Sequence, residues 1–339
     1  MKVVVTGGGG YIGTSLVPML LESGHEVTVI DRFFFGTATL HTAGNDRSLH
    51  LVRDDTRWFD GKLLVGQDAV IDMAALSNDP AGELDPWKTY DINYLGRARV
   101  ARLAREAGVP RYVLTSSCSV YGFRDGLLDE TTSPNPLTAY ARANVLAEGD
   151  TLPLASEKFC PMAVRFATLY GLSGRMRFDL AVNAMVLGAR NSGKIPIMKD
   201  GTQWRPFLHV RDAARSLAGL LETDLDRIRG RLFNIGSDDQ NFQIAQLAQL
   251  VAENMSKTPT LEWYGDPDRR SYRVSFRRAR EELGFTPRWT PADAAREIES
   301  ALAAGSLVPS LQNKTVEWYR HLLDGGADGQ AVALRGVIL

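Results

Sequence analysis

The chain has 339 residues, more than one hydrophobic core usually serves, so its length favours two lobes that share an interface. Its 39 Lys and Arg residues balance 40 Asp and Glu residues, and 44% of the residues are hydrophobic. These values are typical of a globular protein and give no sign of the basic surface that nucleic-acid binding requires.

The two cysteines, Cys118 and Cys160, are too few for a disulfide framework and fit a reducing compartment. The five histidines lack the spacing of a zinc site, so we expect no metal. The N-terminus leads directly into a strand, without a signal segment, and no apolar run is long enough to span a membrane. We therefore expect a cytoplasmic protein that does not bind membranes.

Residues 2–6, KVVVT, predict a strand buried on both faces of a parallel sheet. The glycines that follow fit two dinucleotide patterns: GxxGxxG, which begins at Gly7, and GxGxxG, which begins at Gly8. Such glycines let the backbone approach a pyrophosphate at the start of the next helix. The predicted phosphate-binding residues are Gly7, Gly10, Tyr11, Ile12 and Gly13.

The second predicted strand, EVTVI, leads to Asp31, 18 residues after Gly13. A carboxylate at this place can bind both hydroxyls of an adenosine ribose and repels a 2′-phosphate, which favours NAD over NADP. The neighbouring Arg32 keeps NADP open as an alternative, because its guanidinium could hold that phosphate.

Strands and helices continue to alternate through LHLVRDD, DAVIDMAAL, a long helix over residues 86–107, and RYVLTSS. This order predicts an α/β fold with a doubly wound parallel sheet of the Rossmann type. Ligands of such sheets bind at the carboxyl ends of the strands. The rule adds to the predicted cofactor site Asp55, Ala74, Ala75, Asn93 and Ser116.

The string TSSCSVYG, residues 115–122, precedes Tyr140, which lies in LTAYARANVLAE. Together with TGGGGYIG, it resembles the extended short-chain dehydrogenase/reductases, in particular their nucleotide-sugar epimerases and dehydratases, over nearly the whole chain. The resemblance implies that NAD is the cofactor and that Ser117 and Tyr140 handle a proton. It also implies a homodimer built from the long helix after Pro86 and the helix that carries Tyr140.

Members of this family have a lysine four residues after the tyrosine, which lowers the pKa of the phenol and binds the nicotinamide ribose. Here that position holds Asn144, which we include with Tyr140 among the predicted catalytic and cofactor-binding residues. Its side chain forms hydrogen bonds but carries no charge. The nicotinamide ring could supply the charge, another cation could approach from elsewhere, or Tyr140 could be weak or idle. A deliberate replacement of the lysine is a fourth alternative. Arg142 is a poor substitute, because it lies two residues along the helix and points away from Tyr140.

The residues after Ser117 bear on the type of reaction. In the 4,6-dehydratases of the family, the two residues after the catalytic threonine are acidic, whereas here they are Cys118 and Ser119. The sequence therefore disfavours 4,6-dehydration. We expect Cys118 to be a buried structural thiol.

The second half of the chain resembles the nucleotide-sugar lobe of the family. Thr168 stands where the family has an asparagine, and DGTQWRPFLHVRDAA matches the segment that carries a phosphate-binding arginine, here Arg205. Arg270 is preferred to Arg269 as a second diphosphate contact, although a surface charge run is the alternative. His209 and Asp212 are expected to fix the start of a helix near Val210. The implied substrate-binding residues are Ser77, Ser119, Thr168, Asn183, Arg205 and Arg270.

The predicted organisation is an NAD-binding Rossmann domain over residues 1–170, to which later segments return, and a nucleotide-sugar-binding domain over residues 171–325. Residues 326–339 are expected to form a loosely structured tail. The expected reaction is the epimerisation of a nucleotide-diphosphate sugar through a transient keto-sugar. The alternatives are a ketoreductase or dehydratase of such a sugar, and a non-catalytic NAD-binding protein.

Overall fold

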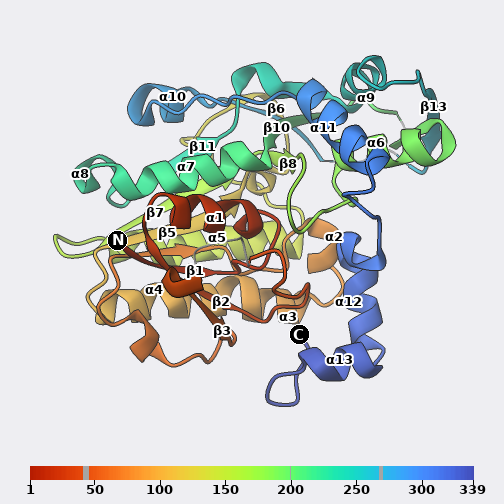
Figure 1. The fold of residues 1–339 in the computed structure, drawn as a ribbon. Coiled ribbons are helices and arrows are strands. Elements are labelled where there is room, and N and C mark those ends of the chain that lie inside the picture. The colour runs from red at the N-terminus through yellow and green to blue at the C-terminus, as the bar shows by residue number, and fades with distance from the viewer. Residues whose placement is uncertain (41–45, 199, 267–269) are drawn as a thin grey trace.

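The computed structural model describes residues 1–40, 46–198, 200–266 and 270–339. At its centre lies a parallel seven-stranded sheet in the order β11-β7-β5-β4-β1-β2-β3 (Figure 1). Its strands are β1 (Lys2–Thr6), β2 (Glu26–Asp31), β3 (Leu49–Arg53), β4 (Ala69–Asp72), β5 (Arg111–Ser117), β7 (Cys160–Phe166) and β11 (Leu232–Ile235). The strand order reverses between β1 and β4, where doubly wound sheets bind their ligands. The predicted Rossmann-type α/β fold is confirmed.

Helices cover both faces of this sheet. Successive side chains of β1 point to opposite faces and therefore pack in two different cores. Val3 and Val5 pack in the core that includes α1 (Gly13–Glu22) and α7 (Val210–Glu222). Val4 packs on the other side, with α4 (Arg97–Glu106) and α5 (Ala139–Thr151). The run of consecutive valines that predicted a doubly buried strand is fully buried.

The predicted helix over residues 86–107 is interrupted. It consists of α3 (Pro86–Tyr90), a π-helical segment η3 (Asp91–Gly96) and α4. Asp85 caps α3 by accepting a hydrogen bond from the Lys88 amide at 3.1 Å. Hydrophobic periodicity does not reveal the π segment, although such segments are frequent at functional sites.

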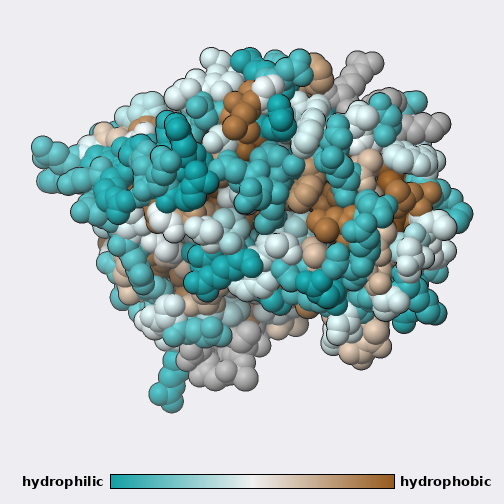
Figure 2. Space-filling view, turned by 90° about the horizontal axis from the view of Figure 1, so that it is seen from above, coloured by the Kyte–Doolittle hydropathy of each residue, from teal (hydrophilic) through white to brown (hydrophobic). Residues whose placement is uncertain are grey.

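The second lobe contains α6 (Ala181–Ser192), α9 (Ile244–Glu253) and α11 (Pro291–Ala303) around a separate core. Its strands are β8 (Thr168–Tyr170), β10 (Trp204–His209) and β12 (Asn241–Gln243) in one sheet, and β9 (Lys194–Met198) with β13 (Thr260–Tyr264) in another. β8 follows β7 after the single residue Ala167, so the second lobe begins at the carboxyl edge of the large sheet. Seen from above this lobe, the surface is mostly hydrophilic with a few separate hydrophobic patches (Figure 2).

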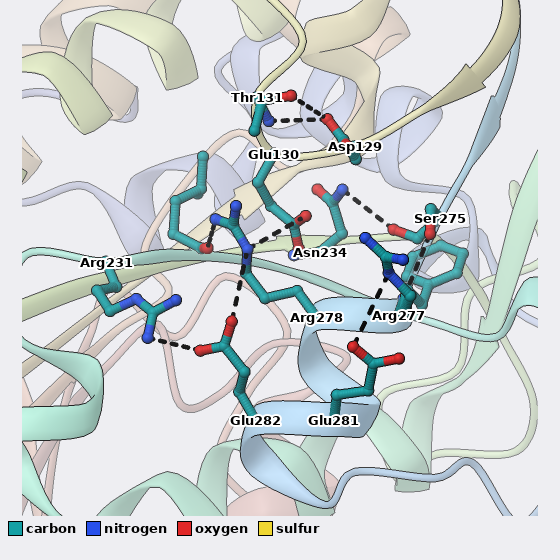
Figure 3. Close-up of polar contacts among 12 residues, drawn as sticks. Asp129, Glu130, Thr131, Arg231, Asn234, Ser275, Arg277, Arg278, Glu281 and Glu282 are labelled. Atoms are coloured by element: carbon teal, nitrogen blue, oxygen red, sulfur yellow. Dashed lines mark hydrogen bonds and ion pairs between the residues drawn. The ribbon is translucent and has the colours of Figure 1, made fainter.

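Later segments return to the first lobe, beginning with α7, α8 (Leu225–Ile228) and β11. β14 (Ser271–Val274) pairs with β6 (Phe123–Leu128), and α10 (Arg277–Leu283) follows. Arg278 of α10 donates to the carbonyl of Leu232 at 3.1 Å and lies 3.7 Å from the carboxylate of Glu130 (Figure 3). The same carboxylate accepts from the amide of Asn234 in β11 at 2.8 Å. Glu130 therefore joins α10 to the edge strand of the sheet.

The C-terminal residues are ordered, contrary to the expectation of a loose tail. α12 (Thr315–Leu323) is followed by α13 (Ala327–Val332) and by a short reversal in which Leu334 and Val337 exchange backbone hydrogen bonds of 2.9 and 3.0 Å. Leu339 is buried in a cluster that contains Leu76 and Trp318. The segment was expected to be loosely structured because it is short and lies at the end of the chain. Its apolar residues Ile338 and Leu339 nevertheless pack in the cluster that contains Leu76, which lies in the loop after β4.

None of the described helices is both long and apolar enough to cross a membrane. Within the described part of the chain, no group of three His, Cys, Asp or Glu side chains is placed to hold a metal ion.

Candidate active site

One cavity of about 510 Å³ runs between the two lobes, at the carboxyl ends of the central strands. Its wall includes Asp31 at the end of β2, Phe34 after it, Tyr140 from α5, Arg205 from the second lobe and Tyr272 from β14. Every predicted site residue lies on this wall except Asn93, Asn144 and Asn183. Gly7 and Arg270, which are 263 positions apart in the sequence, are thus brought to one site.

The glycine loop is shaped by close backbone contacts. Gly7 has φ +70°, and a Cβ built on it would lie 2.7 Å from the amide nitrogen of Ala74. A Cβ on Gly13 would lie 2.2 Å from the carbonyl oxygen of Gly8. The loop can therefore close only without side chains, and it leaves the first N–H groups of α1 at the cavity, where a phosphate would bind. These residues fit the pyrophosphate of a dinucleotide.

Asp31 ends β2 with its carboxylate held in place. It accepts hydrogen bonds from the amides of Gly9, at 2.9 Å, and Phe33, at 2.7 Å. Burial raises the pKa of Asp31, and these amide hydrogen bonds oppose the rise. A carboxylate fixed at this strand end fits the ribose hydroxyls of NAD.

Arg32, the residue that kept NADP open, is committed elsewhere. Its Nη1 lies 2.9 Å from Oδ2 of Asp55, and its Nη2 donates to the carbonyls of Val337 at 2.7 Å and Val332 at 3.1 Å. The side chain is buried. A guanidinium that is held by a carboxylate and by the C-terminal segment is not placed to receive a 2′-phosphate, so the geometry favours NAD.

Two of the three asparagines outside the wall, Asn93 and Asn183, support it from behind. Asn93 accepts from the amide of Leu76 at 2.8 Å and donates to its carbonyl at 3.0 Å, which fixes the loop after β4. Asn183 accepts from the amide of Gly171 at 2.9 Å and donates to the hydroxyl of Tyr11 at 3.1 Å. Both are fully buried. The predictions that Asn93 touches the cofactor and that Asn183 touches the substrate are therefore corrected: both residues position the backbone.

Tyr140 lies in the first turn of α5, which Thr138 caps. The Thr138 hydroxyl accepts from the amide of Ala141 at 3.1 Å and donates to Oδ1 of Asp79 at 2.5 Å. Asp79 begins α2 (Asp79–Gly82), and a Cβ on Gly82 would lie 2.9 Å from the Cβ of Tyr140. The close approach of α2, which only glycine permits, fixes where Tyr140 enters the cavity.

Ser117 is the last residue of β5, and its side chain is among the polar groups close enough to Tyr140 to lower the pKa of the phenol. Its hydroxyl also accepts from the amide of Ser119 at 3.1 Å. The predicted pair of Ser117 and Tyr140 is thus brought together. Ser116, by contrast, lies on the wall but directs its hydroxyl to Glu148 at 2.5 Å. Glu148 also pairs with Arg165 at 2.6 Å, so this carboxylate is bound within the fold.

The phenol of Tyr140 is not acidic by itself. Burial raises its pKa, and the nearby carboxylate of Asp79 raises it further. The guanidinium of Arg97 and the neighbouring polar side chains of Ser117 and Asn144 oppose this rise. Arg97 is a functional candidate that the sequence did not reveal, because it lies 43 residues before Tyr140 on another helix.

The second-lobe end of the cavity carries the predicted substrate residues. Arg205 donates to the carbonyls of Trp204, at 2.8 Å, and Arg270, and its guanidinium lies 5.1 Å from the ring centre of Tyr272. Arg270 pairs with Asp79, which links this end to the α2 that packs on Tyr140. Arg269, the rejected alternative, lies outside the described residues. Ser119 is buried on the wall, and within the described residues its hydroxyl has no hydrogen-bond partner, so it is available to a ligand.

Two further wall residues, which lie shortly before α6, were not found from the sequence. Arg177 pairs with Asp179 at 2.6 Å and donates to the hydroxyl of Ser77 at 3.3 Å. Arg175 lies with its guanidinium 3.7 Å above the ring of Phe35, and burial, aided by Arg177, lowers its pKa to about 10. Arg175 and Arg177 alternate with the buried Met176 and Phe178. This two-residue period is the pattern in the sequence that could have indicated two arginines on one side of an extended segment.

The residues expected to be structural are so. Cys118 is buried and its pKa is raised by burial. His209 caps α7 by accepting from the amide of Arg211 at 3.1 Å, and Asp212 in the first turn accepts from the amide of Arg288 at 2.8 Å. Thr168 lies on the wall in β8, half-buried.

Comparison with known proteins gives consistent matches. The model of the NAD dependent epimerase/dehydratase family matches residues 3–236. UDP-glucuronic acid decarboxylase 1 of Arabidopsis thaliana is 29% identical over 307 residues, which cover 85% of this chain and 66% of the relative. The chain spans about two thirds of the length of such plant relatives.

Solved structures are similar over a larger share of their length. MoeE5 in complex with UDP-glucuronic acid and NAD has a TM-score of 0.78 and 29% identity, with 91% of this chain and 100% of that chain covered. UDP-glucuronic acid 4-epimerase from Bacillus cereus, in complex with UDP-glucuronic acid and NAD, has a TM-score of 0.80 at 23% identity, covering 90% and 99%. At this lower identity, the second likeness is one of fold.

Proposed function

Because this chain belongs to the NAD dependent epimerase/dehydratase family, we propose that it epimerises a nucleotide-diphosphate sugar through a transient keto-sugar. NAD is the cofactor, and when bound it would supply a nicotinamide that can accept a hydride from the sugar carbon and return it. The observation that supports this proposal best is that Ser117 and Tyr140 lie together on the wall of the cavity between the lobes.

The proton chemistry belongs to Tyr140. In this proposal its phenolate oxygen takes the proton of the sugar hydroxyl as that carbon is oxidised, and returns it after the keto-sugar has presented its other face. Ser117 orients the phenol and the sugar hydroxyl. No acidic pair follows Ser117, since Cys118 is buried and Ser119 is neutral, so an elimination would lack its acid and base.

The substrate class follows from the second-lobe end of the cavity. We propose that Arg205 and Arg270 face the diphosphate and that Ser119 and Thr168 contact the sugar. Support comes from the unpartnered hydroxyl of Ser119 and from MoeE5, which binds UDP-glucuronic acid and UDP-glucose. UDP-glucuronic acid is therefore the first substrate to test.

Decarboxylation is the second candidate, favoured by the UDP-glucuronic acid decarboxylases among the relatives. Oxidation at C4 of a glucuronic acid creates a β-keto acid, which can lose its carboxylate as carbon dioxide before the ketone is reduced. Both reactions recycle the cofactor, so only the product distinguishes them.

We also propose a cytoplasmic homodimer. Trp87 of α3, Leu95 of η3 and Leu146 of α5 are 85%, 51% and 43% exposed, which leaves large apolar side chains on the layer that the family resemblance assigns to the dimer. The two cysteines are free and buried, in keeping with a reducing compartment. Sedimentation should give twice the mass of the chain, and Trp87→Asp should lower it.

The decisive experiment supplies C4-deuterated UDP-glucuronic acid to the NAD-loaded protein and follows the sugar by NMR. An epimer that keeps its deuterium, without accumulation of NADH, supports epimerisation. A pentose product with release of carbon dioxide would replace it with decarboxylation, and lasting NADH would indicate a dehydrogenase.

Tyr140→Phe is the matched variant for this assay. Loss of the phenol should lower turnover by about 10²-fold or more while NAD still binds. Tyr94→Phe, which removes only an exposed hydroxyl bonded to Asp150 at 3.1 Å, is the control and should keep its turnover. Binding of NAD without turnover of any UDP-, GDP-, CDP- or TDP-sugar, in the protein and in Asn144→Lys, would favour a non-catalytic protein.

A further inference from the structure

Arg97 is a buried cation on the wall of the cavity. It follows the π-helical segment η3 and begins α4, with 1% of its surface exposed. Its Nη2 donates to the backbone carbonyl of Asp72 at 3.2 Å and to that of Thr115. The guanidinium therefore sits across the carboxyl ends of β4 and β5, where the cofactor cleft opens.

The other terminal nitrogen of Arg97 reaches the position of the missing lysine. Nη1 donates to Oδ1 of Asn144 at 3.1 Å, and Nδ2 of Asn144 donates to the backbone carbonyl of Tyr140 at 3.1 Å. Asn144 itself is off the cavity wall, whereas Arg97 lies on it. The chain thus has a neutral amide at the family's lysine position and a cation bonded to that amide from a neighbouring helix.

The charge of Arg97 is only loosely neutralised. The nearest carboxylate oxygen, Oδ2 of Asp72, is 3.7 Å from Nε, and Nε has no hydrogen-bond partner among the described residues. The same carboxylate accepts short hydrogen bonds of 2.5 Å from the hydroxyls of Thr6 and Tyr112. Among the described residues, the hydrogen bonds of the Arg97 guanidinium therefore all go to neutral oxygens, one of which belongs to Asn144 of α5.

We propose that Arg97 is a positioning residue that takes over the charge of the missing lysine, polarising Asn144 and stabilising the phenolate of Tyr140. This inference rests on the proposed function, since it concerns the same proton transfer. Arg97 is then the protein's source of positive charge near Tyr140, since Asn144 is neutral.

The surroundings of Tyr140 agree with this assignment. The groups that act on its ionisation are the Asp79 carboxylate from α2, the Arg97 guanidinium from α4, Ser117 from β5 and Asn144 from α5. Of these, burial and Asp79 oppose ionisation, and Arg97 is the one cation among them. Bound NAD adds the positive charge of its nicotinamide, so the two cations act together on the phenol.

The proton and electron balance needs no further reactant. The phenolate oxygen of Tyr140 takes the hydroxyl proton of the sugar, the carbon loses its hydrogen with two electrons to NAD, and a carbonyl forms. The return reaction uses the same proton and electrons. Arg97 keeps its own protons throughout.

A purely structural role is the competing explanation, because Arg97 also joins two strand ends. The two explanations differ in a measurable way. A structural role predicts that replacing Arg97 lowers stability without changing the ionisation of Tyr140. The proposed role predicts a change in ionisation that depends on charge and that a lysine at position 144 restores.

The test measures the pKa of Tyr140 in the NAD-bound protein by NMR of tyrosines labelled at the ring carbon that bears the hydroxyl. The chain has ten tyrosines, and Tyr140→Phe assigns the signal. Arg97→Gln keeps hydrogen bonding without charge, and Arg97→Lys keeps the charge. We expect the pKa to rise by about one pH unit or more in Arg97→Gln, to change little in Arg97→Lys, and to return in Arg97→Gln/Asn144→Lys.

Three results would overturn the inference: an unchanged Tyr140 pKa in folded Arg97→Gln, an equal rise in Arg97→Lys, or no recovery in the double variant. If Arg97→Gln does not fold, Arg97→Met, which keeps the length of the buried side chain without its charge, is measured in its place and should raise the Tyr140 pKa by a similar amount. An unchanged pKa in that variant would contradict the inference. The measurement uses no sugar, so absence of turnover would refute the proposed function while leaving this result to stand.

Discussion

Arg32 and Asp55 form a buried ion pair at the Asp31 end of the cavity, with 2.9 Å between Nη1 and Oδ2. A second arginine, Arg57, approaches the same carboxylate at 2.9 Å. The pair turns the guanidinium of Arg32 toward Asp55 and the C-terminal carbonyls. Cofactor choice is thereby left to the neighbouring Asp31, whose carboxylate is held at the end of β2.

The first prediction concerns Asp31→Asn. Loss of the charged acceptor should weaken NAD binding about tenfold, in line with the value of a hydrogen bond to a charged group. NADP should not gain a comparable affinity, because Arg32 remains paired with Asp55. Calorimetric titration with both cofactors measures this. Tight NADP binding by the variant would show that Arg32 can leave Asp55.

The second prediction concerns the glycine loop. Gly13→Ala places a Cβ 2.2 Å from the carbonyl oxygen of Gly8, so the loop must shift and NAD affinity should fall more than tenfold. Gly219→Ala is the control: this glycine lies in α7 with no atom within 4 Å of the added Cβ. The control should keep its affinity and gain up to about 1 kcal/mol of stability. Equal NAD affinity in both variants would contradict the assigned phosphate site.

The third prediction is a pH dependence from Asp55. Burial pushes its pKa upward, but hydrogen bonds and charge from Arg57 and Arg32 outweigh burial, and the net pKa is below the ordinary value. A carboxyl whose folded pKa is depressed stabilises the fold above its unfolded pKa, and this stabilisation is lost as the pH falls through the folded value. Asp55→Asn should therefore cost about 3 kcal/mol of unfolding free energy at pH 7.

Urea unfolding at pH 7, 5, 4 and 3.5 tests the sign. The difference between the protein and Asp55→Asn should be constant down to about pH 5 and shrink below about pH 4. Asp226→Asn, which breaks an exposed ion pair with Arg229, is the matched control and should cost at most about 1 kcal/mol. A difference that grows toward acid pH would contradict the assignment.

The fourth prediction concerns the C-terminal segment. Removal of residues 327–339 takes Ile338 and Leu339 off the cavity wall and frees Nη2 of Arg32 from two carbonyls. NAD should then dissociate about tenfold faster, which corresponds to a loss of about 1.4 kcal/mol of binding free energy. The loss of one large apolar side chain from the contact surface is enough to account for this amount. Exchange of bound against labelled NAD measures the rate.

A milder variant separates this effect from unfolding. Ile338→Ala/Leu339→Ala keeps the bonds to Arg32, and α12 stays anchored by the hydrogen bond of 2.8 Å from the Trp318 indole to the carbonyl of Phe34. We expect it to accelerate NAD release less than the deletion does. An unchanged rate in both variants would mean that the segment does not retain the cofactor.

The sequence by itself indicated the fold class, the glycine loop and Asp31, and its resemblance to a known family added the pair of Ser117 and Tyr140. The first three features depend on local order: alternating strands and helices, glycines at a fixed spacing, and polar residues directly after strands. Each of these three features depends on residues that are close together in the sequence, so it can be recognised without the tertiary structure.

Only the tertiary structure decided which polar groups meet across segments. Arg97 forms a hydrogen bond with Asn144 from another helix. Arg32 pairs with Asp55 and donates to C-terminal carbonyls. Asn183 forms hydrogen bonds with Tyr11 and Gly171 and does not face the cavity. A buried polar group must find its partner wherever packing brings one, so the partner's distance along the chain is arbitrary. For this reason, the charge beside Tyr140 could not be found from position 144 alone.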